Sequence, residues 1–228
     1  MVPGARRQDG ARPARAGARL PGTRSLGLEE FDPFWDACVK AGIPVSMHAS
    51  DSGYSEYLND WEPGDEFKPF APTSFRMVAM GKRPIEDTMA ALVCHGALTR
   101  NPDLRILSIE NGADWVPYLL KQFKSVYSKM PQGFLEDPIE AFRRCVYVAP
   151  FWEDDFAQMA ELCGVDRVIF GSDWPHPEGL AEPTKLIDDL QGLDEAGQRK
   201  VMGGNMIDLF KIPNEVVHKP DVPALVLN

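Results

Sequence analysis

Residues 168–179 read VIFGSDWPHPEG, an apolar run that ends in an aspartate and continues through a histidine and two prolines. A short apolar run of this kind is typical of a strand buried in a parallel sheet. Such strands usually end at small turn residues, whereas here Asp173 closes the run and Pro175 and Pro177 stiffen the chain that leaves it. An acid at this position is well placed to bind a metal ion at the mouth of a barrel. The stretch therefore predicts a strand that ends in a metal ligand.

Helical and extended patterns alternate along the rest of the chain. Apolar spacing and turn residues predict helices at 29–41, 85–100, 115–130, 154–163, 183–191 and 195–210. They predict strands at 43–48, 105–110, 145–149 and 167–173. Strands separated by helices indicate parallel β/α units, and therefore an α/β barrel or a doubly wound sheet. The sequence has no glycine-rich nucleotide-binding motif after any strand, which leaves the doubly wound, nucleotide-binding sheet without support.

Three of the predicted strands end in groups that bind metals or move protons: His48, Glu110 and Asp173. A barrel gathers the carboxyl ends of its strands, and hence its functional residues, around one mouth. Since side chains two apart share a face of a strand, we expect a small residue one layer below each polar one. The expected pairs are Ser46 with His48, Ser108 with Glu110 and Gly171 with Asp173, while Leu107, Ile109 and Phe170 face the helices.

Charge and composition limit the class of protein. The formal net charge is −10, which argues against nucleic-acid or membrane partners. The expected partner is a small-molecule substrate. Residues 1–27 begin with an arginine-rich stretch that has few large apolar residues, so we expect a disordered tail before a domain at 28–212. Residues 213–228 are expected to form a C-terminal tail. The four cysteines show no paired spacing, and we interpret them as reduced thiols of a cytoplasmic protein.

Four segments together resemble the amidohydrolase-related family. They are IPVSMHAS (43–50), GALTRNPDLRILSIENGADW (96–115), VIFGSDWPHPEG (168–179) and VMGGNMIDLF (201–210). This family includes aminocarboxymuconate-semialdehyde decarboxylase, γ-resorcylate decarboxylase and many metal-dependent hydrolases. The resemblance implies a distorted (β/α)8 TIM barrel that holds one divalent metal ion, usually zinc and sometimes manganese.

The resemblance also implies roles for individual residues. His48 matches the metal-binding histidine of the family's fifth strand, and Asp173 matches the metal-binding aspartate of its eighth. Glu110 stands where the decarboxylases carry a sixth-strand histidine, and it is expected to act as a general acid or base. His176 is expected to orient a ligand or the substrate. The long segment after His48 predicts a substrate-covering loop, from which Tyr54 and Trp61 reach the substrate together with Trp174.

The family's first-strand His-x-His pair has no counterpart, since the histidines are His48, His95, His176 and His218. We therefore expect the chain to correspond to strands five to eight, the C-terminal half of the barrel, and to be truncated at its N-terminus. With only two confident ligands, we expect weak metal binding by this chain.

Several functions remain open at this stage. The first is a metal-dependent hydrolase or decarboxylase that acts on a small carbonyl or carboxylate compound. The alternatives are a catalytically inactive barrel fragment and a binding module that a partner chain completes. Because half a barrel leaves unpaired sheet edges, association of two copies is also expected.

Overall fold

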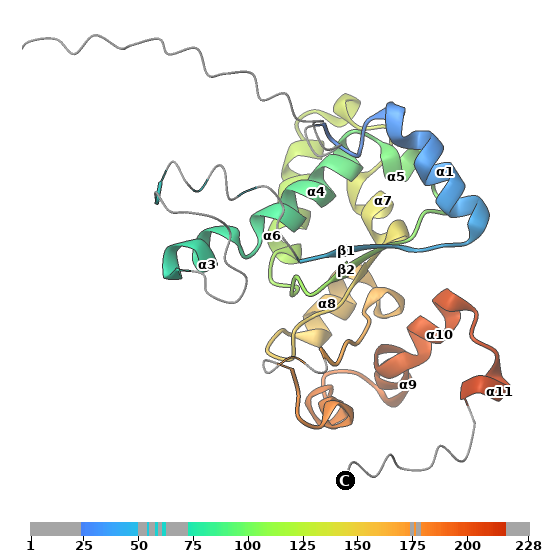
Figure 1. Cartoon of the computed structure of the whole chain (residues 1–228). Helices are drawn as coiled ribbons and strands as arrows, with labels where there is room; N and C mark the ends of the chain where they lie inside the picture. The colour runs from blue at the N-terminus through green and yellow to red at the C-terminus, as the bar shows by residue number, and fades with distance from the viewer. Residues whose placement is uncertain are drawn as a thin grey trace, which may run out of the picture.

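A computed structural model describes residues 24–49, 54, 58, 61–62, 73–173, 176 and 179–217 (Figure 1). A small parallel sheet lies at the centre, with helices packed beside it. None of the helices in these ranges is both long enough and apolar enough to cross a membrane.

The sheet contains the strands β1 (Val45–His48), β2 (Ile106–Ile109) and β3 (Val146–Val148), all parallel and in the order β1-β2-β3. These three strands confirm the extended segments expected around residues 43–48, 105–110 and 145–149. The expected fourth strand at 167–173 is wrong as a full strand. There the chain makes only a single parallel bridge, between Val168 and Val148, before it turns away. The fold is therefore α/β with a parallel sheet.

The helices are α1 (Asp32–Ala41), α3 (Ser74–Met80), α4 (Arg83–Cys94), α5 (Ala97–Arg100), α6 (Val116–Tyr127), α7 (Pro138–Cys145), α8 (Phe156–Cys163), α9 (Glu195–Arg199), α10 (Asn205–Phe210) and α11 (Asn214–Val217). Two long helices expected from the sequence are interrupted. The first breaks after Cys94 because Gly96 adopts a left-handed φ of 80°, and the second contains a π-helical turn at Lys200–Gly204. The segment expected as a helix at 183–191 is a 3-10 helix at Pro183–Asp189.

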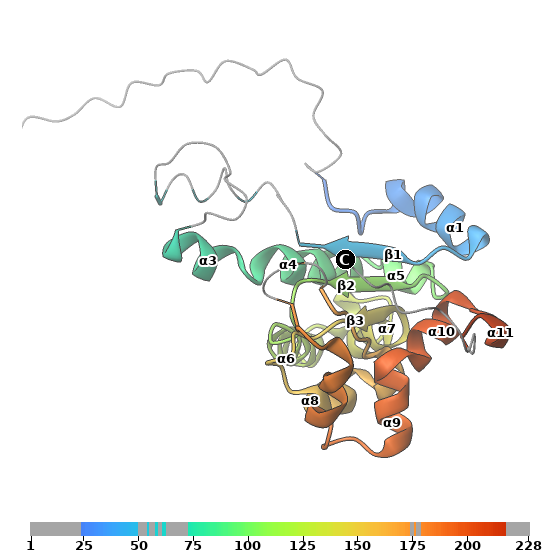
Figure 2. The same ribbon diagram turned by 60° about the horizontal axis from the view of Figure 1, so that its bottom comes forward.

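The helices α3 and α7 were not expected. The helix α7 begins at the Asp137–Pro138 pair, where the Asp137 side chain accepts a hydrogen bond from the amide of Ile139. Cys145 is consequently the last residue of a helix rather than the first of a strand. The helix α3 lies beyond the carboxyl end of β1, away from the main body (Figure 2).

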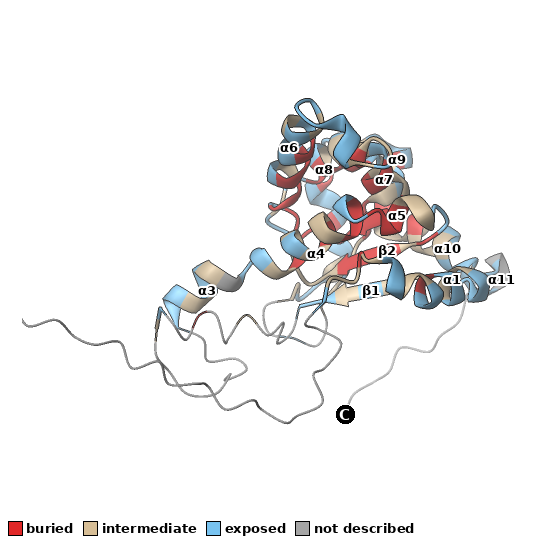
Figure 3. Ribbon diagram, turned by 90° about the horizontal axis from the view of Figure 1, so that it is seen from above, coloured by how far each residue is buried: buried red, intermediate tan, exposed pale blue. Residues whose placement is uncertain are grey.

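Buried residues concentrate where the helices meet β2, whereas β1 lies at the rim with intermediate and exposed residues (Figure 3). The larger apolar cluster joins the helices to one sheet face, which contributes Ile106, Val146, Val148 and Val168. A smaller cluster on the opposite face holds Leu107, Tyr147, Ala149 and Ile169, with Ile109, Met206 and Leu209 packed against it.

This arrangement corrects the expected faces of β2. Ser108 pairs in register with Met47 and Val148 on the helix side, where it is completely buried, so it does not lie beneath Glu110 in an open lumen. Leu107 and Ile109 instead share the face of Ser46 and His48, with which they pair in register. The alternation expected within β1 is retained. Leu107 and Ile109 lie on the face opposite the larger cluster of helices, and the residues packed in their cluster, Met206 and Leu209, belong to α10.

Residues just before 28 also contact the domain. The Leu26 carbonyl accepts a hydrogen bond of 3.0 Å from the indole of Trp35, and the Gly27 carbonyl accepts one of 2.9 Å from Arg100. Gly27 also approaches α4 so closely that a Cβ atom would lie 2.2 Å from the Ala91 carbonyl oxygen. Residues 24–27 therefore pack against the domain, which corrects the expected boundary of the tail. Residues 1–23 and 218–228 lie outside the described residues.

Two partly buried arginine–carboxylate pairs predict a loss of stability in acid. Arg100 donates to Asp32 over 2.6 Å and 3.0 Å, and Arg144 donates to Glu136 over 2.8 Å. These hydrogen bonds hold the pKa of both carboxyls below their ordinary values of 3.8 and 4.5. Because the folded pKa is the lower one, the stabilisation is complete above the ordinary pKa and is lost as the pH falls through the folded value. We expect the free energy of unfolding to decline below about pH 5.

Urea denaturation at a series of pH values measures this decline. The double variant Asp32→Asn, Glu136→Gln should be less stable at neutral pH and should show a shallower decline in acid. An equally steep decline in the double variant would assign the acid sensitivity to other carboxyls.

Candidate active site

The residues that follow the strands reach the site through two unusual backbone turns. Glu110 follows β2 with φ 57°, and Asp173 ends the segment after the Val168 bridge with φ 55°. Residues other than glycine rarely adopt these left-handed values, which cost free energy that the surrounding structure must offset. Since the backbone turns at both positions, the alternation of the preceding strand does not set the direction of either side chain.

The two carboxylates converge with two histidines. Glu110 Oε2 lies 2.8 Å from His48 Nε2, and Glu110 Oε1 lies 3.5 Å from His176 Nδ1. Asp173 Oδ1 lies 3.2 Å from the same His176 nitrogen. The structure therefore brings together all four residues that the sequence singled out for metal binding and catalysis, with Glu110 between His48 and the Asp173–His176 pair.

A tight turn returns His176 to Asp173. The His176 amide donates to the Asp173 carbonyl over 2.8 Å, and the Gly179 amide donates to the His176 carbonyl over 3.1 Å. A Cβ atom on Gly179 would lie 2.9 Å from the Ser172 carbonyl oxygen, so the close return of the chain requires glycine. The turn places the imidazole of His176 beside the carboxylate that precedes it by three residues.

His48 is oriented by the backbone at its own strand end. Its Nδ1 lies 2.7 Å from the Ala49 carbonyl oxygen, which accepts a hydrogen bond from that nitrogen in the Nδ1–H tautomer. Metal-binding histidines commonly donate one ring N–H to a carbonyl in this way, which leaves the other nitrogen for the metal. In His48 the other nitrogen is Nε2, which faces Glu110.

Asn111 ties the carboxyl ends of β1 and β2 together, a role that sequence reasoning missed. Its side-chain amide donates to the carbonyls of Met47, over 2.8 Å, and Ile109, over 2.7 Å. These two bonds set the separation of His48 and Glu110, which stand next to the bonded residues. An asparagine directly after a strand-end acid was the available signal, but the sequence did not show which carbonyls it would reach.

The variant Asn111→Asp tests this tie. The change replaces an amide donor by a carboxylate, which cannot donate to the two carbonyls and repels them. We expect the free energy of unfolding to fall by about 1–3 kcal/mol, the usual cost of unpaired buried polar groups. Guanidinium denaturation measures the change. The control is Gln158→Glu, the same change from amide to carboxylate at an exposed residue of α8.

A cavity of about 430 Å³ lies beside the carboxylates. Glu110, Glu153 and Asp173 supply its acidic groups, and none of its described lining residues is a lysine or arginine. Its apolar lining is formed by Met77 of α3, Pro150, Phe151 and Trp152 after β3, Phe170, Leu180 and Leu186. The cavity therefore combines an apolar, partly aromatic wall with an acidic end.

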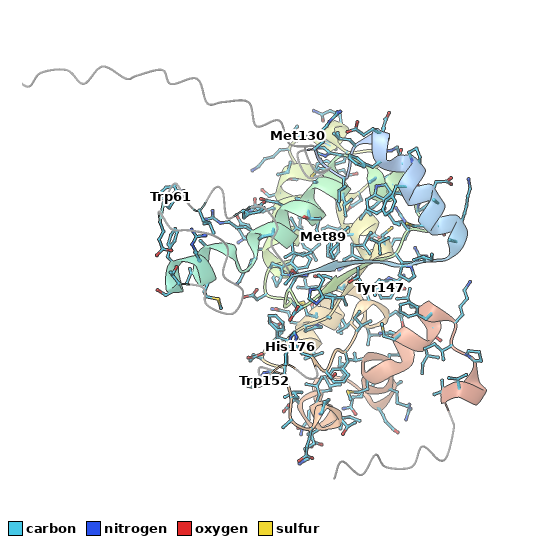
Figure 4. All side chains as sticks on the ribbon, viewed as in Figure 1. Trp61, Met89, Met130, Tyr147, Trp152 and His176 are labelled. Carbon is cyan, nitrogen blue, oxygen red and sulfur yellow. The ribbon has the colours of Figure 1, made fainter. Side chains whose placement is uncertain are left out.

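The aromatic residues expected to contact substrate lie in different places. The Tyr54 hydroxyl donates to Asp87 of α4, and burial raises the pKa of this phenol. Trp61 is 66% exposed and lies away from the sheet, on the side of α3 (Figure 4). Trp152 lines the cavity, and His176 contacts Glu110 and Asp173 of the same cavity. Neither Tyr54 nor Trp61 lines the cavity, and Trp174 lies outside the described residues, so their substrate role stays a prediction. Phe151 and Trp152 were missed because they occupy a short loop without a distinctive motif.

The donor set suits a divalent ion that binds nitrogen and oxygen ligands. One ligand atom each from Glu110, Asp173 and His176 lie within 4.8 Å of one another. Imidazole and carboxylate are the ligands that zinc and manganese take in proteins, at about 2.0–2.2 Å for zinc. Three such donors with an open side match the ligand number of a catalytic centre. The residues therefore fit a divalent metal ion.

Comparison with known proteins identifies the class to which this fold and site belong. The sequence model of the Amidohydrolase family matches residues 5–212. The chain therefore belongs to the amidohydrolase family, which confirms the resemblance found in the sequence. A crystal structure of an amidohydrolase from Mycobacterium avium subsp. paratuberculosis K-10 superposes with a TM-score of 0.75 and 42% identity, over 83% of this chain and 47% of that one. The match to this amidohydrolase indicates that the described α/β structure, with its parallel sheet, has a TIM-barrel-type fold.

Two curated relatives are decarboxylases. The 2-amino-3-carboxymuconate-6-semialdehyde decarboxylase of Dictyostelium discoideum is 22% identical over 203 residues, which cover 84% of this chain and 52% of that protein. The 6-methylsalicylic acid decarboxylase of Penicillium expansum is 24% identical over 198 residues, which cover 83% of this chain and 56% of that protein. The chain spans about half the length of these relatives.

A further solved structure shares the fold at lower identity. It is a dihydroxybenzoic acid decarboxylase from Polaromonas sp. JS666 with bound manganese and the inhibitor 2-nitroresorcinol, with a TM-score of 0.57 and 19% identity. The match covers 82% of this chain and 55% of that one.

Proposed function

We propose that the protein is a divalent-metal-dependent decarboxylase of the amidohydrolase family that acts on a small, planar carboxylic acid. The convergence of His48, Glu110, Asp173 and His176 at one end of a parallel sheet, beside an apolar cavity, carries this proposal. The two decarboxylases among its relatives support decarboxylation over hydrolysis.

We further propose that β1, β2, β3 and the segment 168–173 correspond to strands five to eight of the family's barrel. The order β1-β2-β3, followed by the Val148–Val168 bridge, supports this correspondence, as does the share of the relatives' length that the chain covers. In this correspondence His48 and Asp173 occupy the positions of metal ligands.

His48 and Asp173 would hold the ion, with His176, whose ring nitrogen lies 3.2 Å from Asp173, close enough to add a donor. The expectation of weak binding rested on two ligands, and the additional donor supports tighter binding than those two alone. When bound, a divalent ion supplies a Lewis acid that polarises a carboxylate or carbonyl oxygen of the substrate.

The chain's own residues would perform the remaining steps. Decarboxylation breaks a carbon–carbon bond, releases carbon dioxide and leaves an electron pair on the substrate carbon, which then takes a proton. Glu110, paired with His48 over 2.8 Å, is the group proposed to deliver that proton. Phe151 and Trp152 would hold the planar body of the substrate and exclude water from the cavity.

The test is carbon dioxide release by the full chain, incubated with manganese or zinc and a panel of aromatic and unsaturated carboxylic acids. We expect release that depends on the ion and that a chelator abolishes. Ion-dependent hydrolysis of ester or lactone substrates without carbon dioxide release would replace the decarboxylase by a hydrolase. Absence of both reactions with the ion bound would contradict the proposal.

A second candidate is a module that a partner chain completes. Within the described strands β1 pairs with β2 alone, so its outer edge presents free backbone groups. This candidate predicts that the chain alone is inactive and sediments as a dimer or larger species at micromolar concentration.

A further inference from the structure

The loops after β2 and β3 are joined by a single carboxylate oxygen. Asp154 Oδ2 accepts hydrogen bonds from the amide of Ala113, over 2.8 Å, and from the amide of Phe151, over 2.7 Å. The first amide belongs to the loop that begins at Glu110, and the second belongs to the loop that carries the aromatic wall of the cavity. The bond to Ala113 joins residues 41 positions apart in the sequence, and the bond to Phe151 joins residues three positions apart.

The two loops also pack directly against each other. Gly112 has a left-handed φ of 60°, and a Cβ atom there would lie 2.8 Å from a ring carbon of Phe151. The same Cβ would lie 3.4 Å from Asp154 Oδ2. Glycine at this position therefore allows the Phe151 ring to lie against the loop that holds Glu110.

The loop after β2 is itself fixed to the core. The Trp115 indole donates to the Gly112 carbonyl over 2.9 Å, and Asn111 bonds the ends of two strands. It follows that the loop after β2 is a rigid support, and that Asp154 attaches the loop after β3 to it. Phe151 and Trp152 are 47% and 51% exposed, so little packing on their outer side holds them in place.

Helix capping does not explain Asp154. The N-cap of α8 is the next residue, Asp155, whose side chain accepts a hydrogen bond from the Gln158 amide. The two groups that donate to Asp154 are neutral backbone amides rather than cations. Burial raises the pKa of its carboxyl above the ordinary value, and the two backbone hydrogen bonds offset only part of that rise. The group is thus a desolvated acceptor directed at two loops.

We propose that Asp154 is a positioning residue that holds the aromatic wall, Phe151 and Trp152, at a fixed place relative to Glu110. The inference rests on the proposed function only in treating the cavity as the substrate site. A planar substrate lying on the wall would then meet the proton-delivering carboxylate in one geometry, and small displacements of such a geometry can cost about a hundredfold in rate.

The variants separate this role from a general loss of stability. Asp154→Ala removes both hydrogen bonds. Asp154→Asn keeps an oxygen in the same place, and since one oxygen accepts both bonds, it should preserve the wall. Asp154→Glu keeps the charge and the acceptor but lengthens the side chain by one methylene, so it should displace the wall even if the alanine variant does not fold. Glu161→Gln, at an exposed acid of α8 that does not line the cavity, is the matched control.

The first measurement needs no activity. The full chain is labelled with 5-fluorotryptophan, and the 19F resonance of Trp152 is assigned with Trp152→Phe. We expect this resonance to shift and broaden in Asp154→Ala and Asp154→Glu, and to stay in place in Asp154→Asn and Glu161→Gln. The resonances of Trp35 and Trp115, each 1% exposed, report an intact core. If the Trp152 resonance does not move in Asp154→Ala or in Asp154→Glu while the core stays intact, the proposal is overturned.

The second measurement uses the substrate that the panel identifies. Asp154→Ala should lower kcat/KM by about 10- to 100-fold, with most of the change in kcat because the displaced wall misaligns the substrate with Glu110, and Asp154→Asn should keep the unmodified value. Equal losses in the alanine and asparagine variants would also overturn the proposal. If no substrate is found, the proposed function fails while the fluorine measurement still decides the role of Asp154.

Discussion

Asp173→Asn is expected to lower kcat/KM of the metal-dependent reaction at least about 100-fold, because it removes a charged metal donor from the cluster. The Asp173 carboxylate lies 3.2 Å from His176 and is one of three groups whose ligand atoms lie within 4.8 Å of one another. An amide in its place is uncharged and binds divalent ions more weakly. Metal content should fall together with activity.

Asparagine is the informative replacement because of the backbone at this position. Asp173 has φ 55°, a conformation that asparagine adopts more readily than most residues, whereas alanine there would add strain. The asparagine variant should therefore retain the fold, so that its loss of activity reports the chemistry of the carboxylate.

Metal content by mass spectrometry and turnover on the identified substrate measure the effect. Asp188→Asn, at an exposed acid of the 3-10 helix Pro183–Asp189, is the matched control and should behave as the unmodified protein. Full metal content and activity in Asp173→Asn would remove Asp173 from the ligand set.

The sequence predicted the elements better than it predicted side-chain directions. The strands that end near His48 and Glu110 follow from apolar runs, and the helix α1 follows from its apolar spacing and from Gly42 at its end. Period-two alternation failed for Glu110 because its left-handed φ redirects the side chain after the strand ends. A positive φ at a residue other than glycine has no sequence signal, since it depends on the tertiary structure that offsets its cost.

The contacts that support the site could not be predicted from the sequence, for a similar reason. Asp154 precedes another aspartate at the start of α8, and two adjacent aspartates before a helix are typical of a helix cap. Only Asp155 caps the helix in the structure. Its bond to Ala113 joins residues 41 positions apart, and the bond of Asn111 to Met47 joins residues 64 apart. Local sequence patterns cannot predict contacts between residues so far apart. The motif residues could be identified because they match motifs of a known family. The residues that hold them in place match no motif and could not be identified.

Trp115→Ala is expected to destabilise the protein by about 3–5 kcal/mol, the usual cost of truncating a large aromatic residue in a core. Trp115 is 1% exposed, and its ring meets that of Phe142 edge to face at 6.1 Å between centroids. The change leaves a cavity between α6 and α7, and it also removes the hydrogen bond from the indole to the Gly112 carbonyl.

The lost hydrogen bond links this stability effect to the site. Gly112 belongs to the loop that carries Glu110 and supports Phe151, so freeing its carbonyl loosens the support of the aromatic wall. Trp115→Phe separates the two effects, because it keeps most of the buried volume and loses the bond. We expect it to cost less than the alanine variant, by guanidinium denaturation, and yet to change the 19F resonance of Trp152. A destabilisation below about 1 kcal/mol in Trp115→Ala would show that the core between α6 and α7 collapses around the missing ring. An unmoved Trp152 resonance in Trp115→Phe would show that the loop after β2 keeps its place without the indole bond, leaving Asn111 and Asp154 as its anchors.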